Sequence, residues 1–167
     1  MKTTLVSGPP CSGKTTYIAE RVRPGDVVVS YDAIADALSA EGTSRKAVRP
    51  FVLSAFFAVL QEQRRARLRG FRGDVWIEQC APRAEQRNRF VVLNGADVVV
   101  LETDAETCHV RALERYGPGK RLTEYIDEID KWWRIFERER ECPQRTIGST
   151  VARKSGLPAR RRVGSPR

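Results

Sequence analysis

Residues 3–19 read T-T-L-V-S-G-P-P-C-S-G-K-T-T-Y-I-A, and residues 8–15 within them match the phosphate-binding loop G-x-x-x-x-G-K-[ST] without interruption. The apolar residues before the loop predict a buried strand, and the residues after it predict a helix whose N-terminal dipole faces the bound phosphates. This strand–loop–helix order is the context that the motif requires. It predicts a nucleoside triphosphate site and, with it, the fold of the chain.

The residues of this phosphate-binding loop (P-loop) have distinct expected roles. Gly8 and Gly13 let successive backbone N–H groups turn inward around the β-phosphate, where a Cβ atom would block the approach. Lys14 is expected to reach the β- and γ-phosphate oxygens of ATP, and Thr15 to offer its hydroxyl to Mg²⁺. The residues assigned to ATP are Gly8, Cys11, Ser12, Gly13, Lys14, Thr15 and Thr16, with Arg111 from a later helix.

Length and composition fit one α/β domain. The 167 residues, 41% of them hydrophobic, can bury one core and are few for two. No stretch approaches the roughly 20 apolar residues of a membrane span, and Met1 is followed by a strand rather than by a signal-peptide pattern. We therefore expect a cytoplasmic protein with no membrane partner and no obligate protein partner. The four cysteines lack C-x-x-C spacing and form no obvious zinc site with the single histidine, His109.

The net charge of +9 is concentrated at one end of the chain. Residues 143–167 contain seven lysines and arginines and no acid, so residues 1–142 carry only +2. We expect residues 1–142 to form the P-loop domain. Residues 143–167, rich in Gly, Pro and Ser, are expected to form a flexible basic tail that attracts polyanions. A solubilising terminus with no partner is the alternative.

Hydrophobic runs and turn residues predict strands that alternate with helices. The expected strands cover residues 3–7, 27–30, 74–78 and 98–101, with a fifth at 145–151. After the P-loop helix, the expected helices cover residues 31–40, 45–70, 82–93, 105–116 and 123–141. This order predicts an α/β fold, a P-loop NTPase three-layer sandwich with a parallel sheet of four to five strands, helices on both faces and a small lid. We expect the first two strands to be fully buried.

Acidic residues follow the second and third predicted strands, and ligands of open parallel sheets lie beyond the carboxyl ends of the strands. Asp32 is placed to accept the proton of an attacking hydroxyl as a general base, or it is only the N-cap of the following helix. Glu78 ends the third strand, where an acid holds Mg²⁺ or orients the substrate. The alternative for Glu78 is an exposed strand-end carboxylate without such a role.

Phosphoryl transfer also needs positive charge opposite the P-loop lysine. Arg111 and Arg115 lie four residues apart on one predicted helix face and precede G-P-G-K-R at residues 117–121, a pattern typical of a lid. A solvated helix is the alternative. On the last helix, Trp133 belongs to the apolar stripe and is expected in the core, whereas Trp132 lies off that stripe and is a candidate for stacking on a base.

The ordered set of motifs resembles a known group of enzymes. The P-loop, Asp32, the acid and R-x-x-x-R after the third strand (Arg83 and Arg87) and the second R-x-x-x-R before the lid resemble the P-loop kinases related to bacteriophage polynucleotide 5′-hydroxyl kinase. Zeta toxins and chloramphenicol phosphotransferase share that plan, and the likeness covers residues 1–140. The resemblance assigns ATP and Mg²⁺ to Lys14 and Thr15, the general base to Asp32, and the transferring phosphate to the lid arginines Arg115 and Arg121.

The resemblance implies an ATP-dependent kinase, and the acceptor is less determined than the ATP site. A hydroxyl of DNA or RNA, most simply a polynucleotide 5′-hydroxyl, is the first expectation, with residues 64–72 and the basic tail contacting phosphates. However, the related polynucleotide kinases carry an Arg one helical turn after the base, where this chain has Ala35. A kinase of a nucleoside, nucleotide, sugar or antibiotic, with residues 51–60 walling its acceptor cavity, is the alternative. A DNA-stimulated ATPase module is a third reading.

Overall fold

A computed structural model of the chain describes residues 1–41 and 43–141. Four strands are formed by β1 (Thr3–Ser7), β2 (Val27–Ser30), β3 (Val75–Gln79) and β4 (Ala96–Val100). Six helices are formed by α1 (Lys14–Ala19), α2 (Tyr31–Leu38), α3 (Arg45–Leu68), α4 (Ala84–Asn94), α5 (Ala105–Tyr116) and α6 (Lys120–Glu141). The predicted fifth strand and the predicted basic tail lie outside the described residues.

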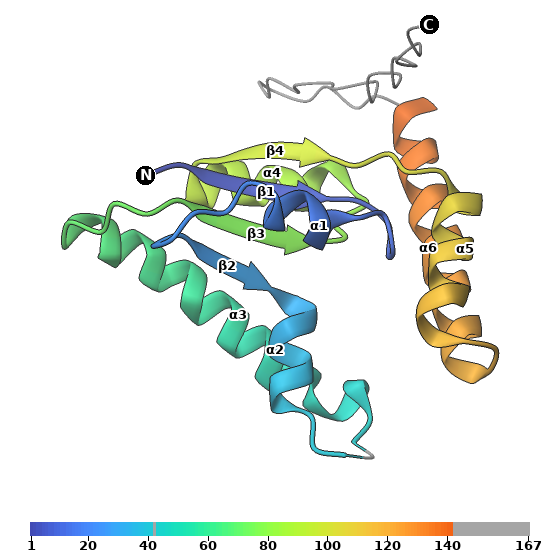
Figure 1. Ribbon diagram of the computed structural model, residues 1–167. Helices are drawn as coiled ribbons and strands as arrows, with labels where there is room; N and C mark the ends of the chain where they lie inside the picture. The colour runs from blue at the N-terminus through green and yellow to red at the C-terminus, as the bar shows by residue number, and fades with distance from the viewer. Residues whose placement is uncertain (42, 142–167) are drawn as a thin grey trace, which may run out of the picture.

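The four strands form one parallel sheet in the order β2-β3-β1-β4, which confirms the predicted α/β fold (Figure 1). In the central strand β1, Leu5 pairs with Ile77 on one side and with Val98 on the other. All five residues of β1 are buried, as expected for a central strand. The expectation of full burial is wrong for β2, because β2 is an edge strand and Val28 is 47% exposed.

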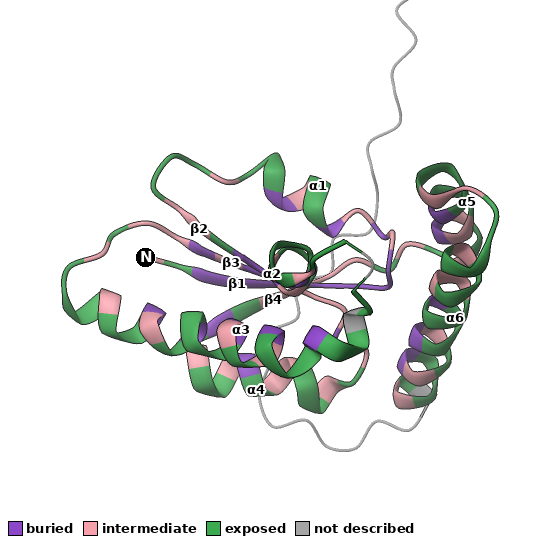
Figure 2. Ribbon diagram, turned by 90° about the horizontal axis from the view of Figure 1, so that it is seen from below, coloured by how far each residue is buried: buried purple, intermediate pink, exposed green. Residues whose placement is uncertain are grey.

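Helices cover both faces of the sheet, as predicted. Figure 2 shows α1 on one face and α3 and α4 on the other. The main core lies between the sheet and the α3–α4 layer, where Phe56 and Leu60 from α3 and Phe90 from α4 pack against Leu5 and Ile77. Phe56 is fully buried and makes edge-to-face contacts with the rings of its neighbours in this layer. This packing fixes the strand ends that carry the candidate site.

The helices α5 and α6 form an antiparallel hairpin at the carboxyl edge of the sheet (Figure 1). Gly117 ends α5 with a φ of 65°, a conformation that favours glycine. A short turn leads directly into α6, which begins at Lys120 rather than near residue 123. Lys120 and Arg121 therefore belong to the first turn of a helix. The lid pattern had suggested that they lie in the connection before it.

On α6, the expectation that Trp132 is free to stack on a base is wrong, whereas the expectation that Trp133 packs in the core holds in part. Trp132 is 2% exposed, stacks on Phe136 with a ring-centroid distance of 4.7 Å, and donates its Nε1–H to the carbonyl oxygen of Cys80 at 2.6 Å. Trp133 is only half-buried and packs against the α5–α6 cluster around Ile129. The apolar side of α6 is wider than one stripe because the helix contacts both α5 and the loop after β3.

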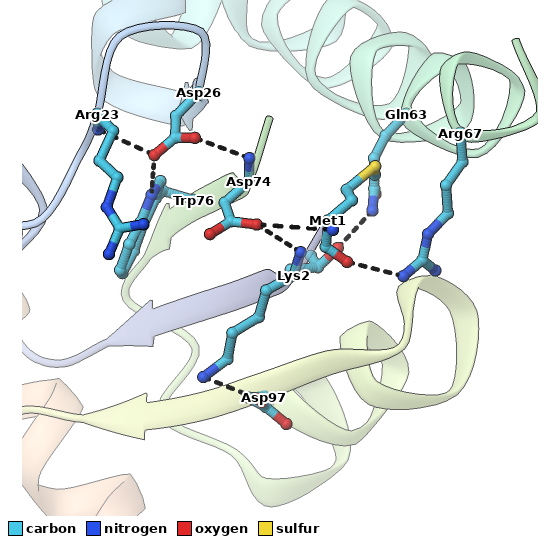
Figure 3. A network of polar contacts seen from close by, with 10 residues as sticks. Met1, Lys2, Arg23, Asp26, Gln63, Arg67, Asp74, Trp76 and Asp97 are labelled. Carbon is cyan, nitrogen blue, oxygen red and sulfur yellow. Dashed lines mark hydrogen bonds and ion pairs between the residues drawn. The ribbon is translucent and has the colours of Figure 1, made fainter. Parts of the chain in front are cut away.

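A polar network closes the opposite, amino edge of the sheet (Figure 3). The Asp26 carboxylate accepts hydrogen bonds from the backbone N–H of Arg23 at 2.9 Å, the backbone N–H of Asp74 at 2.8 Å and the Trp76 indole at 3.3 Å. The backbone N–H donors, that of Arg23 first, lower the pKa of Asp26. The Asp74 carboxylate accepts from the backbone N–H of Lys2 at 2.6 Å. These bonds tie the turn before β2 to the starts of β1 and β3.

Candidate active site

The P-loop connects β1 to α1 in the conformation that its glycines allow. Gly13 has a φ of 93° and Cys11 a φ of 59°, so two residues of the loop adopt left-handed backbone angles. Gly8 lies against the end of β4, where a Cβ atom would come within 2.7 Å of the Ser12 hydroxyl and 2.8 Å of the Leu101 carbonyl oxygen. Only glycine fits at this close approach, because either contact would displace the loop.

The loop curls around its own lysine. Lys14 is 7% exposed, and its ammonium donates to the carbonyl oxygens of Pro9 at 2.7 Å and Gly8 at 3.2 Å. The Ser12 side-chain oxygen is buried and finds no hydrogen-bond partner within the part of the chain that the structure describes. A buried hydroxyl without a partner is costly in a native protein. This orphaned hydroxyl, the buried ammonium and the left-handed backbone together fit a bound polyphosphate.

The two side chains expected to hold Mg²⁺ are in direct contact. The Thr15 hydroxyl donates to Glu78 Oε1 at 2.7 Å, which joins the first turn of α1 to the end of β3. Glu78 is 9% exposed, so the alternative of an exposed strand-end acid is wrong. Hydroxyl and carboxylate oxygens are the ligands that Mg²⁺ prefers, usually completed by water and substrate phosphates. Among the described residues, no group of three or more His, Cys, Asp or Glu side chains could hold a metal ion.

Asp32 lies in the first turn of α2 and faces the loops that follow β1 and β3. The N-cap of α2 is Ser30, whose hydroxyl accepts from the backbone N–H of Ala33 at 3.3 Å, so the alternative that Asp32 is only a helix cap is wrong. Burial raises the pKa of the Cys80 thiol, the positive charge of Lys14 opposes this, and the carboxylate of Asp32 adds to it. Asp32 is thus electrostatically coupled to Cys80 in the loop after β3.

Two arginines from α5 face the P-loop at Cys11. Burial raises the pKa of the Cys11 thiol, and the charges of Arg115, Lys14 and Arg111, in decreasing order, lower it. The guanidinium of Arg111 also donates to the carbonyl oxygen of Cys11 at 3.3 Å. The expectation that the R-x-x-x-R pair of α5 lies near the phosphate site therefore matches the geometry.

Arg121 is placed differently. Its guanidinium lies 4.7 Å from the centre of the Tyr116 ring, and that ring stacks on Tyr125 at 4.3 Å. Arg115 lies over the same ring at 5.4 Å, so it is shared between the hairpin tip and the P-loop. Within the described residues, no hydrogen bond or ion pair connects Arg121 to the P-loop. The structure thus brings together every predicted site residue except Arg121.

A clamp on the loop after β3 was missed by sequence reasoning. The carbonyl oxygen of Cys80 accepts from the hydroxyl of Ser7 at 2.8 Å and from the indole of Trp132. Arg87 donates to the carbonyl oxygens of Ala81 at 2.9 Å and Pro82 at 2.6 Å, and burial lowers the pKa of its guanidinium. The clamp fixes the chain directly after Glu78. The R-x-x-x-R spacing at residues 83–87 was the available signal, but spacing alone does not separate a structural arginine from a ligand-binding one.

Two further residues contribute to the site without a sequence motif. The Thr103 hydroxyl donates to the carbonyl oxygen of Ser12 at 2.9 Å and so supports the P-loop from the connection between β4 and α5. Glu128 on α6 acts on the Cys80 thiol together with Asp32, and both carboxylates raise its pKa. A carboxylate from α6 therefore faces the same region as the predicted base.

None of the described helices is both long and apolar enough to cross a membrane.

Comparisons with solved structures agree with the fold. Among solved structures, a chain of the Pnkp1/Rnl/Hen1 RNA repair complex is similar with a TM-score of 0.58 at 17% identity, over 83% of this chain and 45% of that one. This chain therefore spans less than half the length of that protein. A tunicamycin resistance protein from Deinococcus radiodurans is similar with a TM-score of 0.50 at 19% identity, over 80% of each chain. No curated protein matches the sequence.

The sequence profile described as AAA domain matches residues 4–137. This span contains the P-loop, Asp32, Glu78 and both arginines of α5, so the match and the candidate site coincide. Because the profile covers well over half of the chain, the protein belongs to the AAA domain family, and its α/β fold is that of a P-loop NTPase.

Proposed function

We propose that the protein is an ATP-dependent phosphotransferase that moves the γ-phosphate of ATP to a hydroxyl group, with residues 1–142 as the catalytic domain. The observation that carries this proposal is the convergence of complementary groups on one loop. Lys14 is buried inside the loop, the Thr15 hydroxyl contacts Glu78 at 2.7 Å, and Arg111 and Arg115 approach from α5. A protein that only binds a nucleotide would need the buried Lys14 and the contact between Thr15 and Glu78. It would not need the two arginines on the opposite side of the P-loop.

In this proposal, the protein holds ATP through backbone N–H groups and a few side chains. Lys14 binds the β- and γ-phosphates, and Thr15 with Glu78 holds Mg²⁺, which neutralises phosphate charge when bound. Arg111 and Arg115 stabilise the charge on the transferring phosphoryl group. The remaining contacts come from the loop residues Gly8, Cys11, Ser12, Gly13 and Thr16. Arg121 would join them only after a movement of the α5–α6 hairpin, which would then act as the lid.

Asp32 is the proposed general base. As the acceptor oxygen forms its bond to the γ-phosphorus, the bond from that phosphorus to the β,γ-bridging oxygen breaks and ADP leaves. The proton of the acceptor hydroxyl passes to a carboxylate oxygen of Asp32. The position of Asp32 one loop away from the P-loop, with its charge acting on Cys11 and Cys80, supports this role.

A polynucleotide 5′-hydroxyl is the acceptor that we propose first. The motif order that resembles polynucleotide kinases supports it, and one similar structure belongs to an RNA repair complex. The net charge of +9 favours a polyanionic substrate as well. The acceptor would enter on the side of Asp32, between α2 and the loop after β3.

A small hydroxyl compound is the second candidate, and the position of the basic part of α3 favours it. Arg67, near the end of this helix, donates to the carbonyl oxygen of Met1 at 3.0 Å, so this end lies at the amino edge of the sheet. The arginines that were expected to contact acceptor phosphates are therefore far from Asp32. The acceptor side is left with carboxylates, Asp32 and Glu128, which do not favour a phosphate-rich ligand.

The experiment that tests the proposal is transfer of label from γ-labelled ATP with Mg²⁺ to a panel of 5′-hydroxyl DNA and RNA oligonucleotides, nucleosides, nucleotides and sugars. Label on an oligonucleotide supports the first acceptor class, and suppression of the signal by salt supports a polyanionic substrate. Label only on a small molecule supports the second class. ATP hydrolysis without any labelled acceptor would contradict the phosphotransferase proposal.

A further inference from the structure

The C-terminal end of α3 carries an arginine-rich surface that the proposed catalytic site does not use. The stretch from Gln61 to Asp74 contains five arginines and no lysine. All five are exposed. Two of them, Arg65 and Arg69, share the carboxylate of Glu62 in ion pairs, so one of their two positive charges is compensated. The other three arginines are not compensated in this way.

These three arginines, Arg64, Arg67 and Arg72, form what we call the arginine surface. In the described part of the chain, none of them has a carboxylate partner. Arg67 donates to the carbonyl oxygen of Met1, which fixes its guanidinium but does not neutralise its charge (Figure 3). The nearby acids Asp26 and Asp74 are already bound to backbone N–H groups. The surface therefore keeps three positive charges that no ion pair among the described residues holds, although Asp26 and Asp74 lie nearby.

A pocket lies beside these charges, between α3 and α4. Its volume is about 410 Å³, and Arg64 and Arg67 line one side of it. Leu68 and Leu93 add apolar walls and are 91% and 55% exposed. Asn94 also lines the pocket and donates to the Gln63 side chain at 3.1 Å, which orders its floor. Guanidinium groups next to apolar walls suit a ligand that combines phosphates with sugars and bases.

We propose that the arginine surface binds the sugar-phosphate backbone of a nucleic acid at the edge of the sheet opposite the P-loop. The guanidinium fork binds phosphate oxygens in pairs and is weakly hydrated, which makes Arg the preferred residue for this task. Arg64 and Arg67 lie one helical turn apart and can bind successive phosphates of one strand. Carboxylates of an acidic peptide also pair with this fork. The choice of a nucleic acid therefore rests on the apolar walls formed by Leu68 and Leu93 beside the arginines, which suit sugars and bases.

The distance between the arginine surface and the candidate active site sets the length of a nucleic-acid strand that can contact both. Val48 on α3 packs against Ala35, one turn after Asp32, and Arg67 lies nineteen residues further along the same helix. At about 1.5 Å per residue, the distance is roughly 28 Å. A stacked strand with a spacing of about 3.4 Å per nucleotide needs roughly eight nucleotides to reach from one to the other. Shorter stacked strands do not occupy both places at once.

Binding of a fluorescent single-stranded oligonucleotide of 20 nucleotides, measured against salt concentration, tests the surface. Each phosphate contact contributes about 0.7 to the slope of log affinity against log salt. The double variant Arg64→Gln/Arg67→Gln should therefore reduce the slope by about 1.4. The control Arg134→Gln/Arg138→Gln removes the same charge from exposed positions of α6 and should not reduce it. Residues 143–167 are present in every variant, so the difference reports on α3.

Two outcomes of this experiment would overturn the proposal. One is an equal slope for the Arg64→Gln/Arg67→Gln variant and the control. The other is that polyglutamate or vesicles with anionic lipids bind as tightly as the oligonucleotide and lose affinity to the same extent in the Arg64→Gln variant. Because Arg67 also contacts Met1, the single variant Arg64→Gln guards against a folding defect. It should lower the slope by about 0.7 while the thermal unfolding midpoint stays unchanged.

A second measurement rests on the proposed function as well. The kcat/KM for phosphate transfer to 5′-hydroxyl oligonucleotides should rise as their length passes roughly eight nucleotides, and Arg64→Gln/Arg67→Gln should remove this gain. Transfer that does not depend on length would contradict the role of the surface in substrate binding. Absence of transfer to every oligonucleotide would contradict the proposed acceptor, and the binding experiment would still decide whether the surface exists.

Discussion

The two edges of the sheet treat their polar groups in opposite ways. At the amino edge, the carboxylates of Asp26 and Asp74 are bound to backbone N–H groups of neighbouring segments. At the carboxyl edge, the Ser12 hydroxyl is buried without a partner in the described chain, and the Lys14 ammonium is satisfied only by carbonyls of its own loop. The amino edge is closed by its own residues, whereas the carboxyl edge retains groups that a ligand can satisfy.

Both edges also bring backbone segments unusually close together. At the carboxyl edge, Gly8 lies against Leu101, and at the amino edge a Cβ atom on Gly73 would clash with the carbonyl oxygen of Gly25. Such a close approach occurs at the amino edge as well as at the P-loop. Close approach of glycine therefore does not identify a binding site by itself. A buried polar group without a partner, such as the Ser12 hydroxyl beside Gly8, is the stronger indication of a binding site.

The largest effect is expected from Asp32→Asn at the carboxyl edge. Loss of a general base lowers kcat by roughly 10² to 10⁴, and the ATP Kd should stay nearly unchanged because the residues assigned to the phosphates are those of the P-loop and not Asp32. The matched control is Asp36→Asn, four residues further along α2 and also exposed. Single-turnover transfer and ATP titration measure the two quantities. Equal activity of the two variants would remove Asp32 from the chemistry.

The next effect is expected from Gly8→Ala. The added methyl group would displace the loop from Ser12 and Leu101, and displacement of catalytic groups by about 1 Å costs roughly 10² in kcat/KM. The control Gly95→Ala changes a glycine with a φ of 61° and no atom within 4 Å of its Cβ position. That control should lose stability without loss of ATP affinity. A Gly8→Ala protein with normal ATP affinity would show that the loop is more tolerant than its packing indicates.

Much of the carboxyl edge could be predicted from the sequence. The P-loop, the acids after β2 and β3 and the helix at residues 105–116 are local patterns, and local patterns report on local structure. The direction of α3 could not be predicted in the same way. The sequence places its arginines a few tens of residues after Asp32, and only the path of the helix shows that they end at the other edge of the sheet.

Roles that depend on tertiary contacts were also out of reach. Ser30 and Asp32 are both good N-cap residues, and the end of β2 decides which of them caps α2. Trp132 and Trp133 are neighbours in sequence, and α6 contacts two partners. The apolar stripe of this helix therefore does not decide which of the two is more deeply buried. Arg87 is recognisable by spacing, but its burial against the loop after β3 makes it a structural residue.

A smaller effect is expected from Trp132→Phe, which tests the clamp next to Glu78. Phenylalanine keeps the stack on Phe136 but removes the hydrogen bond to the carbonyl oxygen of Cys80. Because this oxygen keeps its bond from the Ser7 hydroxyl, the free energy of unfolding should fall by about 0.5–1.5 kcal/mol. In the control Trp133→Phe, the lost indole N–H has no partner among the described residues, so the loss should be smaller. Chemical denaturation measures both. The reverse order of stabilities would show that Trp133 is the core residue.

The smallest effect, a pH-dependent one, is expected at the amino edge from Asp26→Asn. The backbone N–H of Arg23, and then that of Asp74, lower the pKa of Asp26 in the folded protein, so the ionised carboxylate stabilises the fold above its unfolded-state pKa of about 4. This stabilisation is lost as the pH falls through the lower folded-state pKa. The difference in denaturation midpoint between the native chain and Asp26→Asn should therefore be present at pH 7 and shrink below about pH 4. The control Asp97→Asn, which removes only an exposed ion pair with Lys2, should show little difference at either pH. A constant difference across this range would mean that the amino edge is held by packing of Trp76 and its neighbours rather than by the charge of Asp26.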